Sequence, residues 1–147
     1  MAHLTQPQLV QLKTEITTDP TARGYAAPYT AGNDGAVAVL LNTRSAAAGT
    51  VAREPMLTQD FIEHFDQTEW NTMSTADATK LALLLSSQFV KVGNATVRGL
   101  LKALWPANGP TRAAIDALAT RPASRAEVLF GAGTTVQGDD VSATRFV

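Results

Sequence analysis

STADATKLALLL, residues 74–85, and NATVRGLLKALWP, residues 94–106, carry the densest apolar periodicity of the chain. Ser74 and Asp77 have the spacing of a capping box, which predicts a helix start. Two apolar stripes follow at helical spacing, first Leu81, Leu84 and Leu85, then Val97, Leu100, Leu101 and Leu104. Pro106 ends the second helix because proline cannot continue the backbone hydrogen bonds. Since the connection is short, we expect the stripes to face each other as a central helical hairpin.

Shorter helices are predicted on both sides of this hairpin. Helix-start signals recur at Thr5-Gln-Pro7, Asn33-Asp34, Thr58, Asp66-Gln-Thr-Glu69, Thr111 and Ser124-Arg-Ala-Glu127. Gly131-Ala-Gly133 is typical of a helix stop. Thr50–Met56 is predicted to be an edge strand because Pro55 lacks a backbone donor, and Thr134–Val136 is a candidate for a second short strand. Ser45–Gly49 is expected to be flexible.

The chain is therefore predicted to be mainly α, a single compact domain over residues 1–147 with a minor β element. Its 147 residues are enough to bury a core without disulfides or metal, and there is no cysteine. Residues 138–147 are polar until Phe146, so we expect this C-terminal tail to be ordered only when something holds it, such as a neighbour in an assembly. The first residues contain no basic or apolar region, so we expect no signal peptide, and apolar runs such as Leu81–Leu85 are too short to span a membrane.

Charge is sparse and unevenly distributed along the sequence. Only 17% of residues are charged, which suits a protein packed against copies of itself or against partners. Residues 1–88 hold five cationic and nine acidic side chains, whereas residues 89–147 hold seven and four. This polarity could steer head-to-tail packing of subunits, although chance scatter over a solvated surface is the simpler interpretation.

Three candidate chemistries find little support in the residues. His64, between Glu63 and Asp66, is expected to be a surface histidine rather than a metal ligand or general base, since no second histidine stands at ligand spacing. The local carboxylate pairs, Glu15 with Asp19 and Glu63 with Asp66, lack an aromatic-rich cleft for a glycoside hydrolase. Gly131-Ala-Gly133 lacks the third glycine of a dinucleotide-binding turn. We therefore predict no catalytic, cofactor-binding or metal-binding residues.

A helix-turn-helix is the main alternative. Residues 97–104, 106–109 and 111–119 have the right proportions, and cations stand at Arg98, Lys102, Arg112, Arg121 and Arg125. The second helix is nearly all alanine, however, and offers only Arg112 to base edges. DNA binding therefore remains an alternative, with a lysis or cell-wall enzyme less favoured still.

Four stretches of the chain resemble a family of small virion-associated proteins encoded by tailed bacteriophages. They are Leu12–Tyr25 (an LK-x-E…DP-x-x-RGY pattern), Asn33–Arg44 with its Leu41-Asn42 step, Phe65–Trp70 (a TE-aromatic step) and Arg121–Val141 (an SRA-x-E helix and the turn after it). This sequence departs from the pattern at Ala26–Tyr29, where the family often moves straight to a capped helix. The resemblance implies no catalytic residue.

The resemblance implies a virion component of the neck or tail, such as a head–tail connector. We therefore predict a non-enzymatic structural protein, assembled into the virion in the host cytoplasm. It would act by oligomeric packing against itself and other virion proteins, without cofactor, small-molecule substrate, membrane or nucleic acid.

Overall fold

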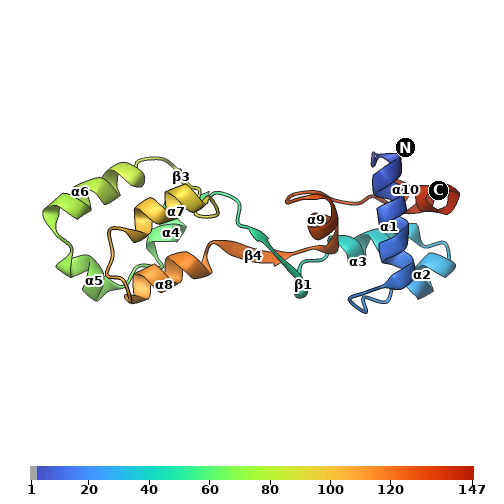
Figure 1. Cartoon of the computed structure of the whole chain (residues 1–147), viewed down its shortest axis with the longest axis horizontal. Helices are drawn as coiled ribbons and strands as arrows, with labels where there is room; N and C mark the ends of the chain where they lie inside the picture. The colour runs from blue at the N-terminus through green and yellow to red at the C-terminus, as the bar shows by residue number, and fades with distance from the viewer. Residues whose placement is uncertain (1–2) are drawn as a thin grey trace. The chain divides into compact units, whose positions relative to one another are not determined.

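The computed structural model describes residues 3–147, which fold into two compact units (Figure 1). Unit 1 combines residues 3–51 with residues 122–147, and unit 2 is the continuous segment between them, Ala52–Arg121. Ten α-helices and four short strands make up the regular structure of residues 3–147, so the predicted mainly α fold with a minor β element is confirmed. No helix in this range is long and apolar enough to cross a bilayer. Whether the two units fold as the single domain that the sequence analysis expects stays a prediction.

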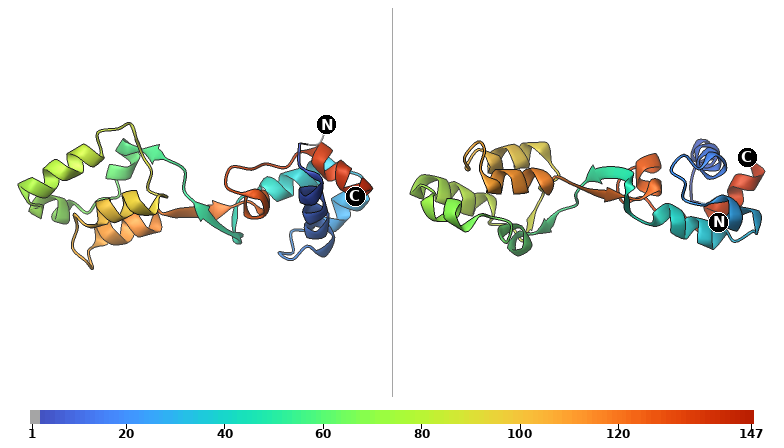
Figure 2. Two further views of the ribbon diagram at one scale, coloured as in Figure 1. Left: turned by 45° about the horizontal axis from the view of Figure 1, so that its top comes forward. Right: turned by 90° about the horizontal axis from the view of Figure 1, so that it is seen from below.

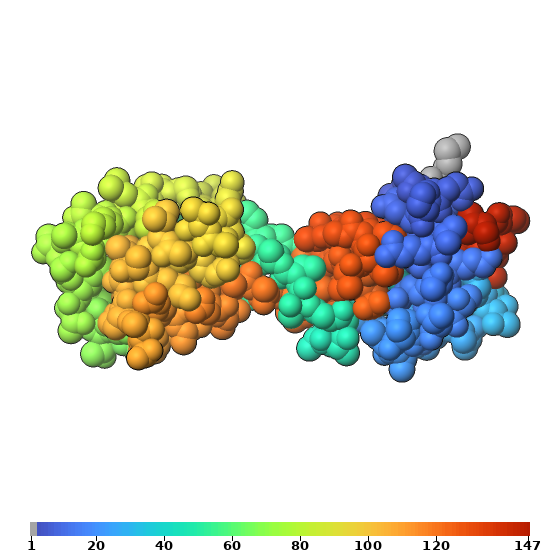
Figure 3. All heavy atoms as spheres, in the orientation of Figure 1, coloured from blue at the N-terminus to red at the C-terminus, as the bar shows by residue number. Residues whose placement is uncertain are grey.

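Unit 1 is built from both ends of the chain. It contains α1 (Gln6–Thr18), α2 (Ala26–Thr30), α3 (Asp34–Asn42), α9 (Arg125–Phe130), α10 (Gly138–Ala143) and the 3-10 helix η1 (Thr144–Phe146). Its core joins Leu12 and Ile16 of α1 to Val37 and Leu41 of α3 and to Val141 of α10, all nearly inaccessible to solvent. Figure 3 shows the C-terminal atoms lying against those of α1.

The polar C-terminal segment, predicted to be ordered only when something holds it, is held by other helices of unit 1. Residues 138–147 form α10 and η1, and α10 packs chiefly on α3. Val141, Asp140 and Thr144 are fully buried. The segment looks polar because its acidic and hydroxyl groups are bonded inside the unit rather than solvated, and α1 and α3 of the same chain hold it.

Unit 2 contains five short helices, α4 (Thr58–Ile62), α5 (Gln67–Thr72), α6 (Thr75–Leu84), α7 (Ala95–Lys102) and α8 (Pro110–Ala117). Strands β2 (Met56–Leu57) and β3 (Phe89–Val90) pair in antiparallel fashion, with Met56 opposite Val90. The core holds Phe61, Leu81, Leu101, Trp105 and Ile115. Aromatic rings add directional packing: Phe65 meets Phe61 edge-to-face at a centroid distance of 5.0 Å, and Trp105 lies 4.9 Å away on a tilt.

The predicted hairpin is only partly closed. Leu81 of α6 and Leu101 of α7 are buried in the same core. The helix that packs along α7, however, is α8, as the two views of Figure 2 agree. Strand β3 lies between α6 and α7 in sequence and pairs with β2, so the connection is not a simple turn. Leu84 and Leu85 are therefore only partly covered.

The remaining strands differ from their predicted positions. Strand β1 (Ser45–Ala52) pairs with β4 (Thr120–Ala123), and each strand contains one of the two points where the chain passes between units. Ser45–Gly49 is thus strand rather than flexible coil. Thr134–Val136 is not a strand: the side chain of Asn42 bonds both the N–H and the carbonyl of Val136, at 2.9 and 2.7 Å, and takes the place of a partner strand.

Several predicted caps are confirmed, and two are used differently. Asn33, Ser74 and Ser124 accept hydrogen bonds from backbone N–H groups of the helices that they precede. Thr58 is not a cap, since its hydroxyl donates to the Ser87 carbonyl while Leu57 precedes the helix. Glu69 completes no capping box with Asp66 and instead binds the start of α8.

Candidate interaction surface

The histidine and the carboxylates singled out from the sequence do not converge on a reactive centre. His64 is exposed on the turn after α4, and Glu63 beside it is exposed as well. Asp19 accepts hydrogen bonds from the backbone N–H groups of Arg23 and Gly24, both at 2.7 Å, and so holds the turn after α1. Within residues 3–147, no group of three or more His, Asp or Glu side chains could hold a metal ion.

Glu15 forms a buried ion pair. Its carboxylate is 4% exposed and receives two hydrogen bonds from the Arg125 guanidinium, Nε to Oε1 at 2.8 Å and Nη2 to Oε2 at 2.7 Å. The hydrogen bond to Glu15 raises the pKa of Arg125 above its usual value. The pair fastens α1 to α9, so Glu15 has a structural role in unit 1.

Asp66 and Glu69 hold two helices of unit 2 together. Asp66 caps α5, accepting from the N–H groups of Thr68 and Glu69 at 3.0 Å. Its own N–H donates to the Thr111 hydroxyl at 2.9 Å, and the Glu69 carboxylate accepts from the Thr111 N–H at 2.9 Å. The Glu69 carboxylate thus occupies the N-terminus of α8, which favours negative charge.

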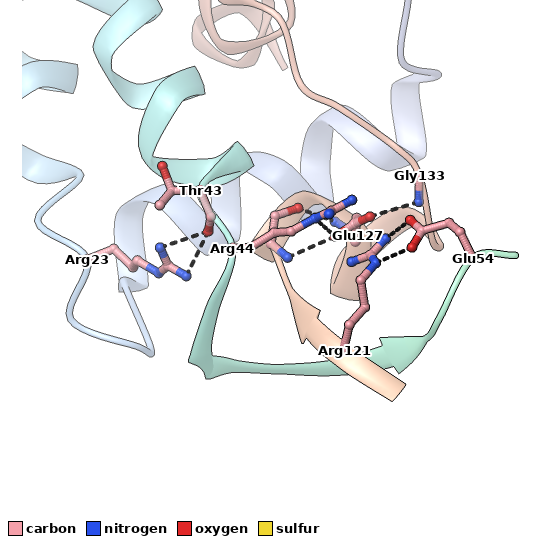
Figure 4. Close-up of polar contacts among 8 residues, drawn as sticks. Arg23, Thr43, Arg44, Glu54, Arg121, Glu127 and Gly133 are labelled. Atoms are coloured by element: carbon pink, nitrogen blue, oxygen red, sulfur yellow. Dashed lines mark hydrogen bonds and ion pairs between the residues drawn. The ribbon is translucent and has the colours of Figure 1, made fainter. Parts of the chain in front are cut away.

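Four of the five cations of the helix-turn-helix alternative, Arg98, Lys102, Arg121 and Arg125, are bound to partners inside their units. Lys102 binds Asp116 at 2.5 Å, and Arg98 donates to the Val92 carbonyl at 3.0 Å. Arg121 is buried and forms a two-pronged ion pair with Glu54 (Figure 4). These contacts stabilise the local fold and leave fewer cations for a nucleic-acid backbone.

The motifs that carry the bacteriophage resemblance supply the internal polar contacts of unit 1. Arg23 donates to the Thr43 carbonyl from both terminal nitrogens, as Figure 4 shows. Buried Glu127 accepts from the N–H groups of Ser124 and Gly133 at 3.0 Å, and Arg44 lies 3.6 Å away. These side chains fasten loops to helices within unit 1.

Asp140 extends this polar framework to the start of the chain. Its carboxylate is fully buried and accepts from the N–H groups of His3, Leu4 and Gln137, at 2.8, 3.1 and 2.8 Å. The His3 ring lies 2.8 Å from the same carboxylate. One residue therefore joins the two termini of unit 1 and begins α10.

Exposed apolar side chains are concentrated in unit 2. Ten large hydrophobic side chains of the described residues are exposed, and six belong to this unit: Leu57, Ile62, Trp70, Leu83, Phe89 and Leu100. Leu83 is 71% exposed and Leu100 is 53% exposed. Large apolar side chains gathered on a surface are typical of a protein–protein contact.

A groove between α6 and α7 holds the two most exposed of these side chains. Its volume is about 450 Å³, and its walls are Asp77, Lys80, Leu83, Leu84, Leu100, Ala103 and Leu104. A hydrogen bond from the Ser74 hydroxyl, together with Lys80, lowers the pKa of Asp77, so its carboxylate is charged at neutral pH. We call this feature the α6–α7 groove.

A second hollow lies on the opposite side of α6, against α4 and α5. Its volume is about 290 Å³, and it is lined by Ile62, Trp70, Met73, Ala78, Leu81, Ala82 and Leu85. Trp70 stacks on Phe65 at a centroid distance of 5.6 Å and is still 40% exposed. Helix α6 is therefore covered incompletely on two sides.

The sequence contains a signal for the exposed apolar surface of α6, which the prediction of a hairpin did not take into account. The run Leu83-Leu84-Leu85 extends around more of the helix than one apolar stripe. A helix that is apolar around most of its circumference needs cover on more than one side. Unit 2 supplies only part of that cover.

In comparisons with known proteins, no family model, no curated protein and no solved structure matches the chain.

Proposed function

We propose that this chain is a bacteriophage virion structural protein of the neck or tail region that works by oligomeric packing. The observation that carries the proposal is the incompletely covered apolar surface of α6 and α7 in unit 2. Burial of such a surface against other subunits drives stable association.

Two further features support this proposal. The motifs that resemble the bacteriophage family serve as internal braces, which a protein acting through its shape requires. Each unit is also close to electrically neutral: unit 1 has five cationic and six acidic side chains, and unit 2 has seven of each. A near-zero charge lowers the repulsion between packed copies.

The test is mass spectrometry of purified particles of the phage or prophage that encodes the chain, followed by location of the chain in a density map of the particle. We expect the polypeptide in particles at a stoichiometry that matches the symmetry of the neck or tail. Its presence in infected-cell lysate with absence from purified particles would overturn the proposal.

A further inference from the structure

The α6–α7 groove carries protruding and recessed apolar groups on one surface. Leu83 and Leu100 are exposed on its walls, whereas Leu84 and Leu104 are partly buried in it. A surface that offers both a projecting side chain and a hollow can pair with itself through a two-fold axis.

The charged residues on the groove are also arranged so that they can pair with those of a second copy. Asp77 and Lys80 lie one turn apart on α6, with Lys80 Nζ 3.0 Å from Asp77 Oδ1. When two α6 helices run antiparallel, Asp77 of one copy faces Lys80 of the other and Lys80 faces Asp77. A partner with an edge of a single sign would instead place a like charge opposite one of these two residues.

We infer that the α6–α7 groove is a self-association surface, in which a second copy of this chain docks through the same groove in a two-fold, antiparallel arrangement. The inference rests on the proposed function, since it names the contact by which oligomeric packing begins. The second copy covers the exposed Leu83 and Leu100, and the Asp77 and Lys80 pairs close the polar edge.

The first test measures the oligomeric state of the full chain by sedimentation and light scattering. We expect a dimer at micromolar concentrations and a dimerisation constant at least about tenfold weaker in Leu83→Glu and Leu100→Glu, because each places a carboxylate in the apolar contact. Val39→Glu is the matched control: Val39 is 65% exposed on α3 of unit 1, outside the groove. That variant should dimerise like the parent chain.

A charge exchange tests the antiparallel arrangement. Lys80→Asp leaves two acidic residues on the groove and Asp77→Lys leaves two basic ones, so each variant should self-associate more weakly than the parent chain. Mixing the two variants should restore the dimer, because every acidic residue then faces a basic one. Failure of the mixture to recover would overturn the antiparallel pairing.

Cross-linking keeps the inference testable if a glutamate variant fails to fold. The chain has no cysteine, so Lys80→Cys offers a single site for a short bis-maleimide linker. We expect covalent dimers from Lys80→Cys and none from Val39→Cys. A parent chain that is monomeric at these concentrations and gives no Lys80→Cys dimer overturns the inference, while particle mass spectrometry separately decides the proposed function.

Discussion

At the scale of single residues, Tyr25 shows how burial alone sets a chemical property. Its side chain is fully buried, and its hydroxyl has no hydrogen-bond partner among the described residues. Burial, with a further contribution from the charge of Glu15, raises the pKa of Tyr25 to about 12. The folded unit therefore retains the proton of this phenol at pH values where the unfolded chain releases it.

We expect this proton to make unit 1 sensitive to alkali. Because the folded pKa is about 12 and the unfolded value is 10.0, the stabilisation is fully present below pH 10 and is lost as the pH rises to 12. The loss should approach ~2–3 kcal/mol, since one pKa unit corresponds to about 1.4 kcal/mol. Urea unfolding of the parent chain and of Tyr25→Phe across this range measures it.

Tyr25→Phe should have the same stability as the parent at neutral pH to within ~1 kcal/mol, since removing an unpaired buried hydroxyl sacrifices no hydrogen bond. Its stability should also fall less steeply above pH 10. Parallel pH profiles for the two proteins would contradict this account of the phenol.

The Glu15–Arg125 pair should be costly to break from one side. Arg125→Met leaves the Glu15 carboxylate buried without its cation, which we expect to lower the free energy of unfolding by ~3–5 kcal/mol. The double variant Glu15→Met, Arg125→Met should lose less than either single variant, because no uncompensated charge remains. Urea titrations of the four proteins give the coupling energy, and strictly additive losses would contradict a direct pair.

Two glycines in unit 2 should respond to alanine in opposite directions. A Cβ at Gly109 would lie 1.7 Å from Glu69 Oε1 and would push that carboxylate away from the N-terminus of α8, so we expect Gly109→Ala to destabilise by ~1–2 kcal/mol. Gly99 lies within α7 with nothing within 4 Å of its added Cβ. Gly99→Ala should stabilise by ~0.5–1 kcal/mol. Thermal melts of both variants provide the comparison.

At the scale of elements, local sequence signals predicted where helices begin and end better than they predicted which elements pack together. The caps at Asn33, Ser74 and Ser124 follow from side chains that bond to the backbone a few residues away, and such chemistry is readable in a sequence. The pairing of β2 with β3 depends on residues far apart in the chain, such as Met56 and Val90. One sequence carries no local signal for that pairing.

The sequence interpretation was least accurate for polar side chains that form hydrogen bonds inside the protein. Asp140 and Thr144 suggested a solvated tail, yet each is buried and bonded. Glu69 suggested a capping box with Asp66, and it reaches Thr111 of another helix instead. The candidate surface was missed for a related reason: the exposure of Leu83 and Leu100 depends on which helices fail to cover them.

The C-terminal element should be required for folding of unit 1. Deleting residues 138–147 removes Asp140 and Val141 and uncovers α3, so we expect loss of helical circular dichroism and rapid proteolysis within residues 3–51. Phe146→Ser is the control, because Phe146 is 86% exposed and its loss should leave the helical signal unchanged. A deletion variant that resists protease would show that unit 1 folds without this element.

At the scale of the whole molecule, the charge segregation seen along the sequence does not persist in three dimensions. Glu15 pairs with Arg125, Asp34 with Arg145 and Glu54 with Arg121, so acidic residues of the first 88 positions meet cations of the last 59. Each unit ends close to neutral. Head-to-tail steering by this polarity therefore finds no support, and the proposed assembly rests on the apolar surface of unit 2 instead.

The aromatic residues allow the two units to be followed separately. Trp70 and Trp105 both belong to unit 2, whereas Tyr25 and Tyr29 both belong to unit 1. We expect a fragment of residues 52–121 to fold alone, because it has its own core and its ends are joined by the hydrogen bond from Arg53 N–H to the Ala119 carbonyl. Its tryptophan fluorescence should reproduce the urea transition of the full chain. An unfolded fragment would favour the single domain predicted from the sequence.

The discontinuity of unit 1 has a consequence for synthesis on the ribosome. The first 51 residues emerge before their partners in α9 and α10 exist, and contacts such as that of His3 with Asp140 span 137 positions. The inserted segment can fold while translation continues, but helices α1 to α3 must wait until α9 and α10 have been synthesised. Termination of synthesis before α10 would therefore leave these helices without their packing partners, and a nascent chain stalled there should be an early substrate for chaperones and proteases.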